Sequence, residues 1–199
     1  MHVSGALVLA AAAAQLVFAA PTPDDAPIVI NWSLLETHEV LDLGNGVKAL
    51  GAEIASANEA SRVKRSLGAR ALNYCGASSF YNKSSGGSPR VSDCAVIRDT
   101  GYRHVGYFVS GPCWLPGSGP PQGSNCYNPW MWYGTCIFGA NSDDSGWAGG
   151  EDIGDLVRDS INKFQWNGLV GAEGTANCVW ATFPNERPVV PTNWAIWHT

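Results

Sequence analysis

The six cysteines constrain the fold of this chain more than any other feature, because all of them follow residue 74. The 199-residue sequence places them at Cys75, Cys94, Cys113, Cys126, Cys136 and Cys178. An even number of cysteines in an exported chain predicts three disulfides and a small, cross-linked domain. Many connectivities are possible, and the spacing favours only Cys113–Cys126, since these two bracket a Pro/Gly-rich loop. Closing a loop of that size is worth roughly 3 kcal/mol in the chain-entropy description.

The same cysteines would be needed for a metal site, but their spacing argues against one. The sequence contains neither a Cys-x-x-Cys nor a His-x-x-x-His pattern, and only His104 and His198 follow residue 65. A structural zinc site needs a set of such ligands at short spacings. We therefore expect no metal and no other cofactor.

The dibasic pair Lys64-Arg65 divides the chain into a front part without cysteine and a back part that holds all six. Such a pair is the site at which kexin-type proteases of the secretory pathway cut. We therefore expect a propeptide over residues 20–65 and a mature domain over residues 66–199. A mature part of this length is one domain of ordinary size.

The first residues predict export. An apolar run from Val3 to Phe18 is too short to span a bilayer as a helix and ends in small residues, as signal peptides do. Cleavage is expected after Ala19, which makes residues 1–19 the signal peptide. The protein is then secreted and extracellular.

The charge of the mature part excludes two classes of partner. It carries eight Lys/Arg and ten Asp/Glu residues, so its net charge is close to −2 with neutral histidines. A nucleic-acid-binding domain would show a basic patch or stripe, and a peptide of the membrane surface a polybasic face. We expect a monomer without a transmembrane segment and without a nucleic-acid partner.

Residue periodicity predicts an α+β domain. Ser88-Pro89 is a helix start signal for a short helix that ends near Asp99 to Gly101. Glu151 to Phe164 carries the strongest apolar stripe and predicts a second helix. Strands are expected before the first helix and over residues 103–109, 132–138, 169–180 and 192–199. This order is typical of two helices packed on one face of an antiparallel sheet.

Six fragments of the mature part, in order, carry a resemblance to a known family. They are Cys75-Gly-Ala-Ser-Ser-Phe80, Ser88-Pro89-x-Val91-x-Asp93-Cys94, Tyr133-Gly134-Thr135-Cys136-x-Phe138-Gly139, Asp152-Ile153-x-Asp155-Leu156-x-x-Asp159-Ser160-Ile161-x-Lys163-Phe164, Gly168-x-Val170-Gly171-Ala172-x-Gly174 and Trp197-His198-Thr199. In this order and spacing they resemble the fungal extracellular effector domain of the necrosis-inducing factors. The resemblance covers nearly all of the mature part, from residue 75 to the end.

The resemblance implies a function and a fold. Members are secreted by fungi and include virulence effectors that plants recognise or that are toxic to plants. Their layout is similar to the virally encoded killer toxin of smut fungi, an α/β-sandwich, which agrees with the element order above. The resemblance supplies no catalytic residue that could be carried over. It implies a non-enzymatic effector that binds an unknown cell-surface or extracellular target of a host or competitor.

The segment from Gly111 to Met131 departs from the family pattern. It is rich in Pro, Gly and Trp, contains the pair Cys113 and Cys126, and looks like an insertion between two strands. Four aromatic residues lie in or beside it: Trp114, Tyr127, Trp130 and Trp132. They are candidate binding residues, because Tyr and Trp are favoured in interfaces. They could equally form a small core of the loop itself.

The alternative function is that of a small secreted hydrolase or of a carbohydrate-binding protein. The first of these would need a catalytic site. The sequence contains no Gly-x-Ser-x-Gly, no His-Glu-x-x-His and no phosphate-binding loop. His198 has no identifiable carboxylate partner, and Asp143-Asp144 are adjacent, so they cannot flank a glycosidic bond. We expect no catalytic residues.

Two short motifs complete the set of candidate sites. Asn82-Lys83-Ser84 is an acceptor for N-glycosylation beside a Ser/Gly-rich turn. From Asn141 to Asp152, oxygen-bearing side chains and Gly146 follow the spacing of a calcium-binding loop. The preceding segment is predicted as strand instead of helix, so a polar turn followed by a helix cap is the favoured interpretation.

Overall fold

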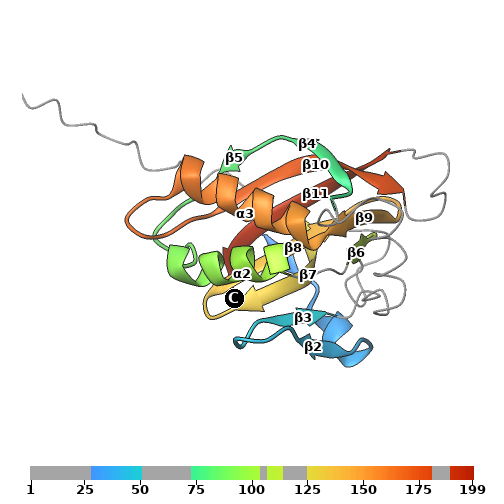
Figure 1. The fold of residues 1–199 in the computed structure, drawn as a ribbon, viewed down its shortest axis with the longest axis horizontal. Helices are drawn as coiled ribbons and strands as arrows, with labels where there is room; N and C mark the ends of the chain where they lie inside the picture. Colours follow the sequence, from blue (N-terminus) through green and yellow to red (C-terminus); the bar gives the residue numbers. More distant parts are fainter. Residues whose placement is uncertain (1–27, 51–72, 104–106, 114–124, 181–188) are drawn as a thin grey trace, which may run out of the picture.

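The computed structural model describes residues 28–50, 73–103, 107–113, 125–180 and 189–199. Its strands are β1 (Val29–Ile30), β2 (Val40–Asp42), β3 (Lys48–Leu50), β4 (Cys75–Ser78), β5 (Tyr81–Asn82), β6 (Tyr107–Ser110), β7 (Cys126–Tyr133), β8 (Cys136–Asn141), β9 (Gly146–Gly149), β10 (Ala172–Trp180) and β11 (Val189–His198). Its helices are the 3-10 helix η1 (Trp32–Glu36) and the α-helices α2 (Val91–Arg103) and α3 (Gly150–Phe164). The ribbon is shown in Figure 1.

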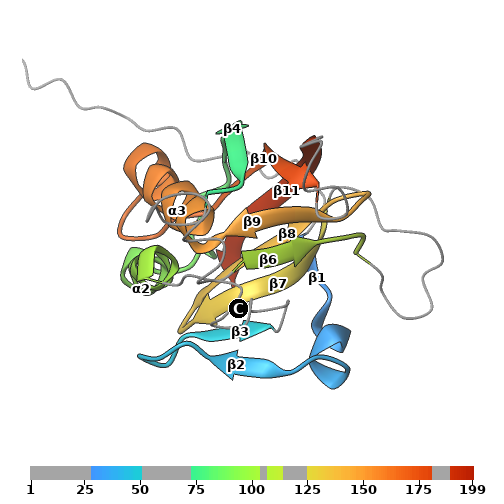
Figure 2. The ribbon, with the colours of Figure 1, turned by 45° about the vertical axis from the view of Figure 1, so that its right-hand side comes forward.

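The described strands form one mostly antiparallel sheet with the order β2-β3-β7-β8-β11-β10-β9-β6. Strands β4 and β5 also pair with β10, and β1 pairs with β7 in parallel. Both α-helices lie on the same side of this sheet (Figure 2). The prediction of an α+β domain with a largely antiparallel sheet and two helices is confirmed, and the parallel β1–β7 pair was not predicted.

Both helices begin where the sequence signals indicate. Helix α3 spans Gly150–Phe164, one residue longer than predicted, and buries Ile153, Leu156, Val157 and Ile161. Helix α2 starts after Pro89 and continues to Arg103, beyond the predicted end near Gly101. At Gly101 a Cβ would lie 2.6 Å from the carbonyl oxygen of Gly150. This glycine therefore allows α2 and α3 to pack closely.

The prediction of one strand over residues 132–138 was wrong. This segment is a hairpin, in which β7 ends at Tyr133 and β8 begins at Cys136. Gly134 forms the turn with a positive φ of 54°, which glycine adopts without steric cost. β-Forming residues stand on both sides of the turn, so the local pattern does not reveal it.

The core lies between the helices and the sheet. Its largest fully buried side chains include Trp194, Phe108 and Phe138. The rings of Phe138 and Trp194 stack with centroids 6.3 Å apart. Aromatic pairs of this kind add to the free energy of burial.

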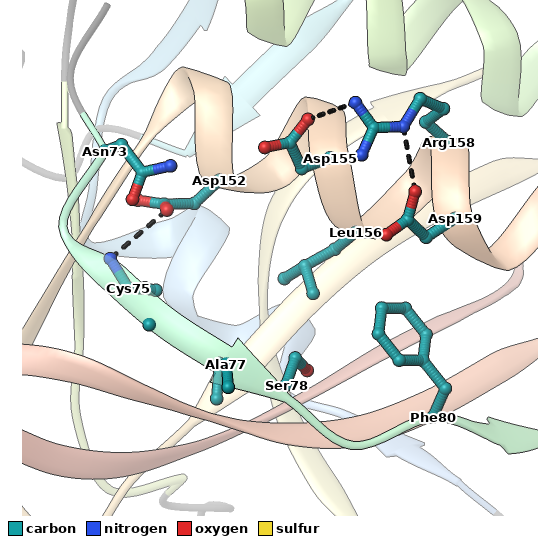
Figure 3. A pocket seen from close by; sticks show the side chains of 12 residues that line it. Asn73, Cys75, Ala77, Ser78, Phe80, Asp152, Asp155, Leu156, Arg158 and Asp159 are labelled. Atoms are coloured by element: carbon teal, nitrogen blue, oxygen red, sulfur yellow. Dashed lines mark hydrogen bonds and ion pairs between the residues drawn. The ribbon is translucent and has the colours of Figure 1, made fainter.

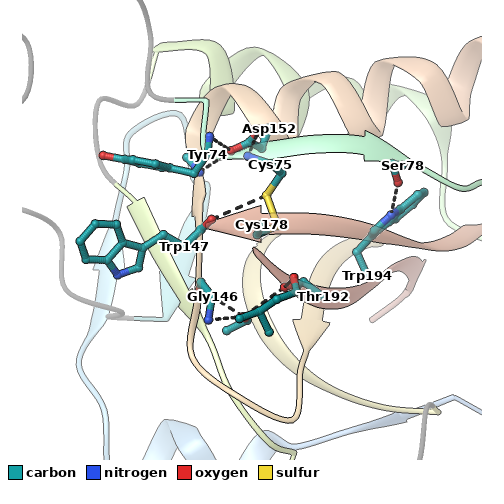
Figure 4. The surroundings of a disulfide bond; sticks show 12 residues. Tyr74, Cys75, Ser78, Gly146, Trp147, Asp152, Cys178, Thr192 and Trp194 are labelled. Carbon is teal, nitrogen blue, oxygen red and sulfur yellow. Dashed lines mark hydrogen bonds between the residues drawn. A yellow bond between two sulfur atoms is a disulfide. The ribbon is translucent and has the colours of Figure 1, made fainter. Parts of the chain in front are cut away.

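Three disulfides connect distant elements of this core. They join Cys75 to Cys178, Cys94 to Cys136, and Cys113 to Cys126. The first links β4 to β10 and is shown with its surroundings in Figure 4. The second links α2 to β8. The third is the pair that the loop spacing favours.

Residues 28–50, which belong to the expected propeptide, are part of this sheet. β1 and β3 both pair with β7, and β2 pairs with β3. Val47 and Ala49 are 0% and 1% exposed and belong to the main core cluster. The segment therefore contributes apolar side chains to the domain that the dibasic pair would separate from it.

None of the helices in the described part of the chain is long and apolar enough to cross a membrane.

Gly174 on β10 tests the close packing of this strand. A Cβ at this position would lie 1.9 Å from the carbonyl oxygen of Ser79, which is backbone and cannot rotate away. We expect Gly174→Ala to lower the free energy of unfolding by about 3 kcal/mol or more. The matched control is Gly76→Ala on neighbouring β4, where the nearest atom is 3.7 Å away. Urea unfolding of both variants decides the point, and equal stability would contradict the packing described here.

Candidate functional site

Three of the four candidate aromatic residues lie in strand β7 instead of a loop. Tyr127, Trp130 and Trp132 all fall within Cys126–Tyr133, whereas Trp114 lies outside the described residues. The segment Gly111–Met131 is therefore not wholly a loop between strands, because its last residues are part of the sheet. This changes the surroundings of each aromatic side chain.

Trp130 is a core residue. Its side chain is 4% exposed and stacks on Phe108 with centroids 5.5 Å apart. It also contacts Phe138 at 6.1 Å. Of the two interpretations of these aromatic residues, as a binding surface or as a small core of the loop, the second is closer for Trp130. Its side chain faces the same core as the helices. Trp130 is therefore not available to a partner.

Tyr127 and Trp132 pack against other aromatic residues. Tyr127 is 3% exposed, and its ring lies 5.2 Å from that of Trp197. Trp132 is half-buried, and its ring meets that of Trp32 edge-on at 6.0 Å. Trp32 belongs to η1, within the expected propeptide. The surroundings of Trp132 therefore depend on whether that segment is present.

A polar hollow of about 180 Å³ lies beside Tyr127. It is lined by Tyr81, Asn125, Tyr127, Glu173, Gly174, Thr175 and Asn193. Ala172 and Ala176 on β10 belong to the core, so the alternating residues Glu173 and Thr175 point to the opposite face of the sheet. This hollow is therefore on the face away from the helices.

A ladder of side-chain hydrogen bonds crosses the strands at this hollow. Thr175 Oγ1 donates to Asn193 Oδ1 at 2.9 Å, and Asn193 Nδ2 donates to Asn141 Oδ1 at 3.0 Å. Asn141 in turn donates to the carbonyl oxygen of Cys126. The amide groups are thereby held in fixed orientations across β10, β11, β8 and β7.

Charge and aromatic surface complete the hollow. Glu173 pairs with Lys83 at 3.2 Å, and Tyr81 is 59% exposed. Burial, and then the negative charge of Glu173, raises the pKa of the Tyr127 phenol above its usual range. Oriented amides, a carboxylate and an exposed tyrosine form a surface that suits a neutral, hydroxyl-rich ligand.

A second hollow, of about 210 Å³, lies between β4 and α3 (Figure 3). Three carboxylates of α3 line it: Asp152, Asp155 and Asp159. The sequence analysis did not single them out as a site, although their spacing places them on successive turns of one helix face. A cluster of carboxylates in a hollow raises the question of hydrolysis.

Asp152 is occupied by backbone donors. Its Oδ2 accepts from the N–H groups of Tyr74 at 2.8 Å and Gly149 at 2.7 Å, and its Oδ1 accepts from that of Cys75 at 3.1 Å. The side chain is 4% exposed, and this burial raises the pKa of Asp152 to about 6 against the lowering effect of the three donors. Asp152 caps α3 and anchors β4, and both of its oxygens have partners.

The other two carboxylates are bound to one arginine. Arg158 contacts Asp155 at 2.7 Å and Asp159 at 2.8 Å. Tyr102 donates to Asp155 at 2.8 Å, and burial followed by this hydrogen bond raises the pKa of Tyr102 to about 12. The charges of this hollow are thus paired with one another, as expected for a structural network.

The residues that follow the spacing of a calcium-binding loop, from Asn141 to Asp152, lie at separate positions in the fold. Asn141 ends β8 and takes part in the polar ladder, while Asp152 caps α3 after strand β9. Both side chains have the hydrogen-bond partners given above. The arrangement is a polar turn, then strand β9, then the cap of α3. In the described part of the chain, no group of three or more His, Cys, Asp or Glu side chains could hold a metal ion.

The remaining candidates are placed as follows. Asn82 is exposed on β5, and its Oδ1 accepts from the N–H of Ser84 at 2.9 Å. His198 lies at the end of β11 with Nδ1 2.8 Å from the carbonyl oxygen of Thr199. Ala19, Lys64 and Arg65 lie outside the described residues.

The raised pKa of Asp152 predicts a dependence of stability on pH. The folded value of about 6 lies above the unfolded value near 3.9, so the protonated form is favoured by folding. The stabilisation is complete below about pH 4 and is lost as the pH rises through 6. Relative to Asp152→Asn, the wild-type chain should lose about 3 kcal/mol of unfolding free energy between pH 4 and 7. Denaturant unfolding at each pH measures the unfolding free energy of both chains. If the wild-type chain instead gains stability relative to the variant as the pH rises, the backbone donors outweigh burial in setting the pKa of Asp152.

The chain is similar to a known protein family and to a curated protein. Residues 74–178 match the Hce2 family, described as "Pathogen effector; putative necrosis-inducing factor". A protein of Penicillium expansum with the name "Probable chitinase LysM18" is 28% identical over 109 residues. The match covers 52% of this chain but 7% of that protein, which is therefore far longer than this chain.

Proposed function

This chain belongs to the Hce2 family of pathogen effectors, and on that basis we propose that it is a secreted effector that acts by binding a target of a host or competing organism. The family match over residues 74–178 is the observation that carries this proposal. It includes all three disulfides and both α-helices. We also propose that the fold of this domain is similar to the α/β-sandwich of the smut killer toxin.

A binding mechanism without catalysis is supported by the state of the carboxylates. Both oxygens of Asp152 accept from backbone N–H groups. Asp155 and Asp159 are paired with Arg158. A catalytic carboxylate must reach its substrate with a free oxygen and a suitable protonation state. Asp152 joins α3 to β4, and Asp155 joins α3 to α2 through Tyr102, whereas Asp159 pairs with Arg158 on its own helix.

We propose that the effector is processed on export, with cleavage after Ala19 and after Arg65. The mature chain then begins at Ser66 and contains no free thiol, in line with its three disulfides. The exposed Asn82 is the expected glycan acceptor. A second acceptor sequence, Asn31-Trp32-Ser33, lies in the expected propeptide. Its Asn31 is 2% exposed and donates to Asn128 Oδ1 at 3.3 Å, so it is unsuited to carry a glycan. The intact mass of the secreted protein reports cleavage and glycosylation together.

Infiltration of leaf tissue tests the proposed function. We expect the purified, processed protein to cause a local response, such as necrosis, at a defined threshold concentration. The double variant Asp155→Asn/Asp159→Asn should act within about twofold of that threshold if circular dichroism shows an intact fold. Loss of activity in a folded carboxylate variant would point to hydrolysis instead. Absence of any response to the wild-type protein, on host leaves and on competing microbes, would contradict the effector function.

A second candidate function is binding of a glycan at the polar hollow. It is favoured by the chemistry of Tyr81, Glu173, Thr175 and Asn193, and by a relative whose name describes a chitinase. The ligand class would be an oligosaccharide of the fungal or host cell wall, with chitin as the first probe.

Sedimentation with insoluble chitin tests this second function. We expect Tyr81→Ala to reduce the bound fraction at least fivefold, because Tyr81 is the exposed ring beside the hollow. The matched control is Tyr102→Ala, which removes an exposed tyrosine from α2 on the helix side. Equal binding by both variants, or none by the wild-type protein, would exclude chitin binding at this hollow.

A further inference from the structure

One edge of strand β7 is occupied by residues 28–50. The N–H of Val29 donates to the carbonyl oxygen of Asn125 at 2.8 Å, and that of Asn31 donates to Tyr127 at 3.0 Å. Further along β7, Lys48 and Ala49 of β3 stand opposite Trp132 and Met131. The other edge of β7 pairs with β8. Figure 2 shows β1 and β3 beside β7.

The same segment also fills part of the core. Val47 and Ala49 lie in the main core cluster, and Leu50 is 6% exposed. Asn31 is buried and bonded to the side chain of Asn128, and Trp32 contacts the ring of Trp132. Backbone pairing and small aliphatic side chains therefore act together to hold this segment on β7.

The only covalent connection between this segment and the rest of the domain is the polypeptide chain. The chain has no cysteine before the dibasic pair, so no disulfide retains residues 28–50 after cleavage at Lys64-Arg65. In the intact chain the segment binds as an intramolecular ligand with a high effective concentration. After cleavage this advantage is lost, and dilution in the extracellular space favours dissociation.

Pro129 marks β7 as a strand suited to an edge. It lies between the positions that pair with β1 and with β3, at a bulge between residues 129 and 131. Proline has no N–H to donate, so in sheets it is confined to edge strands and bulges. Without residues 28–50, β7 has no other partner on this side among the described strands.

We propose that this edge of β7 is the surface at which the effector binds its target, and that residues 28–50 occupy it until cleavage. The proposal rests on the binding function proposed above. The partner is a protein that adds an extended segment to β7, as in other cases of β-strand addition. Its side chains facing the core are small and aliphatic, like Val47 and Ala49, and its backbone supplies donors like those of Val29 and Asn31.

The experiment starts from the folded full chain. It is purified with the dibasic pair intact and cleaved in vitro with a kexin-type protease, then diluted to nanomolar concentration and passed over a size-exclusion column. We expect residues 20–65 to separate from the domain. A fluorescent peptide of residues 28–50 should rebind to the cleaved domain. A peptide with N-methyl groups at Val29 and Asn31 should bind at least tenfold more weakly, because two backbone donors to β7 are removed.

Two controls separate edge pairing from general adhesion. An N-methyl group at Ile30 should have little effect, since successive N–H groups of a strand point in opposite directions. A peptide with Val47→Asp and Ala49→Asp should bind at least tenfold more weakly, because these side chains enter the core. Equal binding of all four peptides would overturn the proposal.

Leaf assays complete the test. The uncleavable chain with Lys64→Ala and Arg65→Ala should be at least tenfold less active than the cleaved protein, and excess peptide 28–50 should inhibit the cleaved protein. Equal activity of cleaved and uncleavable chains would place the target elsewhere and leave the effector function standing. If no form is active, the proposed function fails, whereas peptide rebinding still decides whether the edge is a removable docking site. Absence of rebinding would overturn the inference in either case.

Discussion

The rest of the structure depends on the carboxylate of Asp152, which joins helix α3 to strand β4. It accepts from Gly149 at the start of α3 and from Tyr74 and Cys75 at the start of β4. Cys75 is in turn bonded to Cys178 on β10, so the helix, an outer strand and the central strand are connected through one residue (Figure 4). β10 then holds β11 along its other edge. A buried carboxylate with three backbone partners thus sets where the helix layer meets the sheet.

A second set of contacts, between the start of α2 and the β7–β8 turn, is of the same structural kind. Asp93 at the start of α2 accepts from the N–H and the hydroxyl of Thr135, which follows the glycine turn between β7 and β8. One residue further along each segment, Cys94 and Cys136 form a disulfide. The sequence fragments that carry the family resemblance therefore meet in space as pairs that hold the fold. The contacts of these residues are structural and indicate no binding site.

The sequence predicted those features of the fold that depend on local pattern. The apolar stripe of α3 and the Ser88-Pro89 start of α2 were sufficient to place both helices. The hairpin at Gly134 was missed because strand-forming residues continue on both sides of the turn. Strand β9 was also missed, since Gly146–Gly149 contains little that favours a strand locally and is fixed by pairing with β6 and β10.

The candidate site was harder to predict because burial is a property of the whole fold. Trp130 and Trp132 are two residues apart in β7, yet a bulge and different neighbours place one in the core and the other against Trp32. Local composition cannot distinguish these outcomes. The polar ladder was equally hidden, because Thr175, Asn193 and Asn141 come from three strands that are distant in sequence.

The division of covalent links in this chain has a consequence for stability. The three disulfides close loops of 103, 42 and 13 residues within the part that follows the dibasic pair, and none reaches residues 28–50. Disulfides stabilise mainly by restricting the unfolded chain, and the effect grows with loop length. Val47 and Ala49 stabilise only the folded state, and only while they stay in place. A domain whose unfolded state is already restricted tolerates the loss of such a contribution better than one that depends on its core alone. If residues 28–50 are removed as proposed, the three disulfides still hold the remaining strands and α2 together.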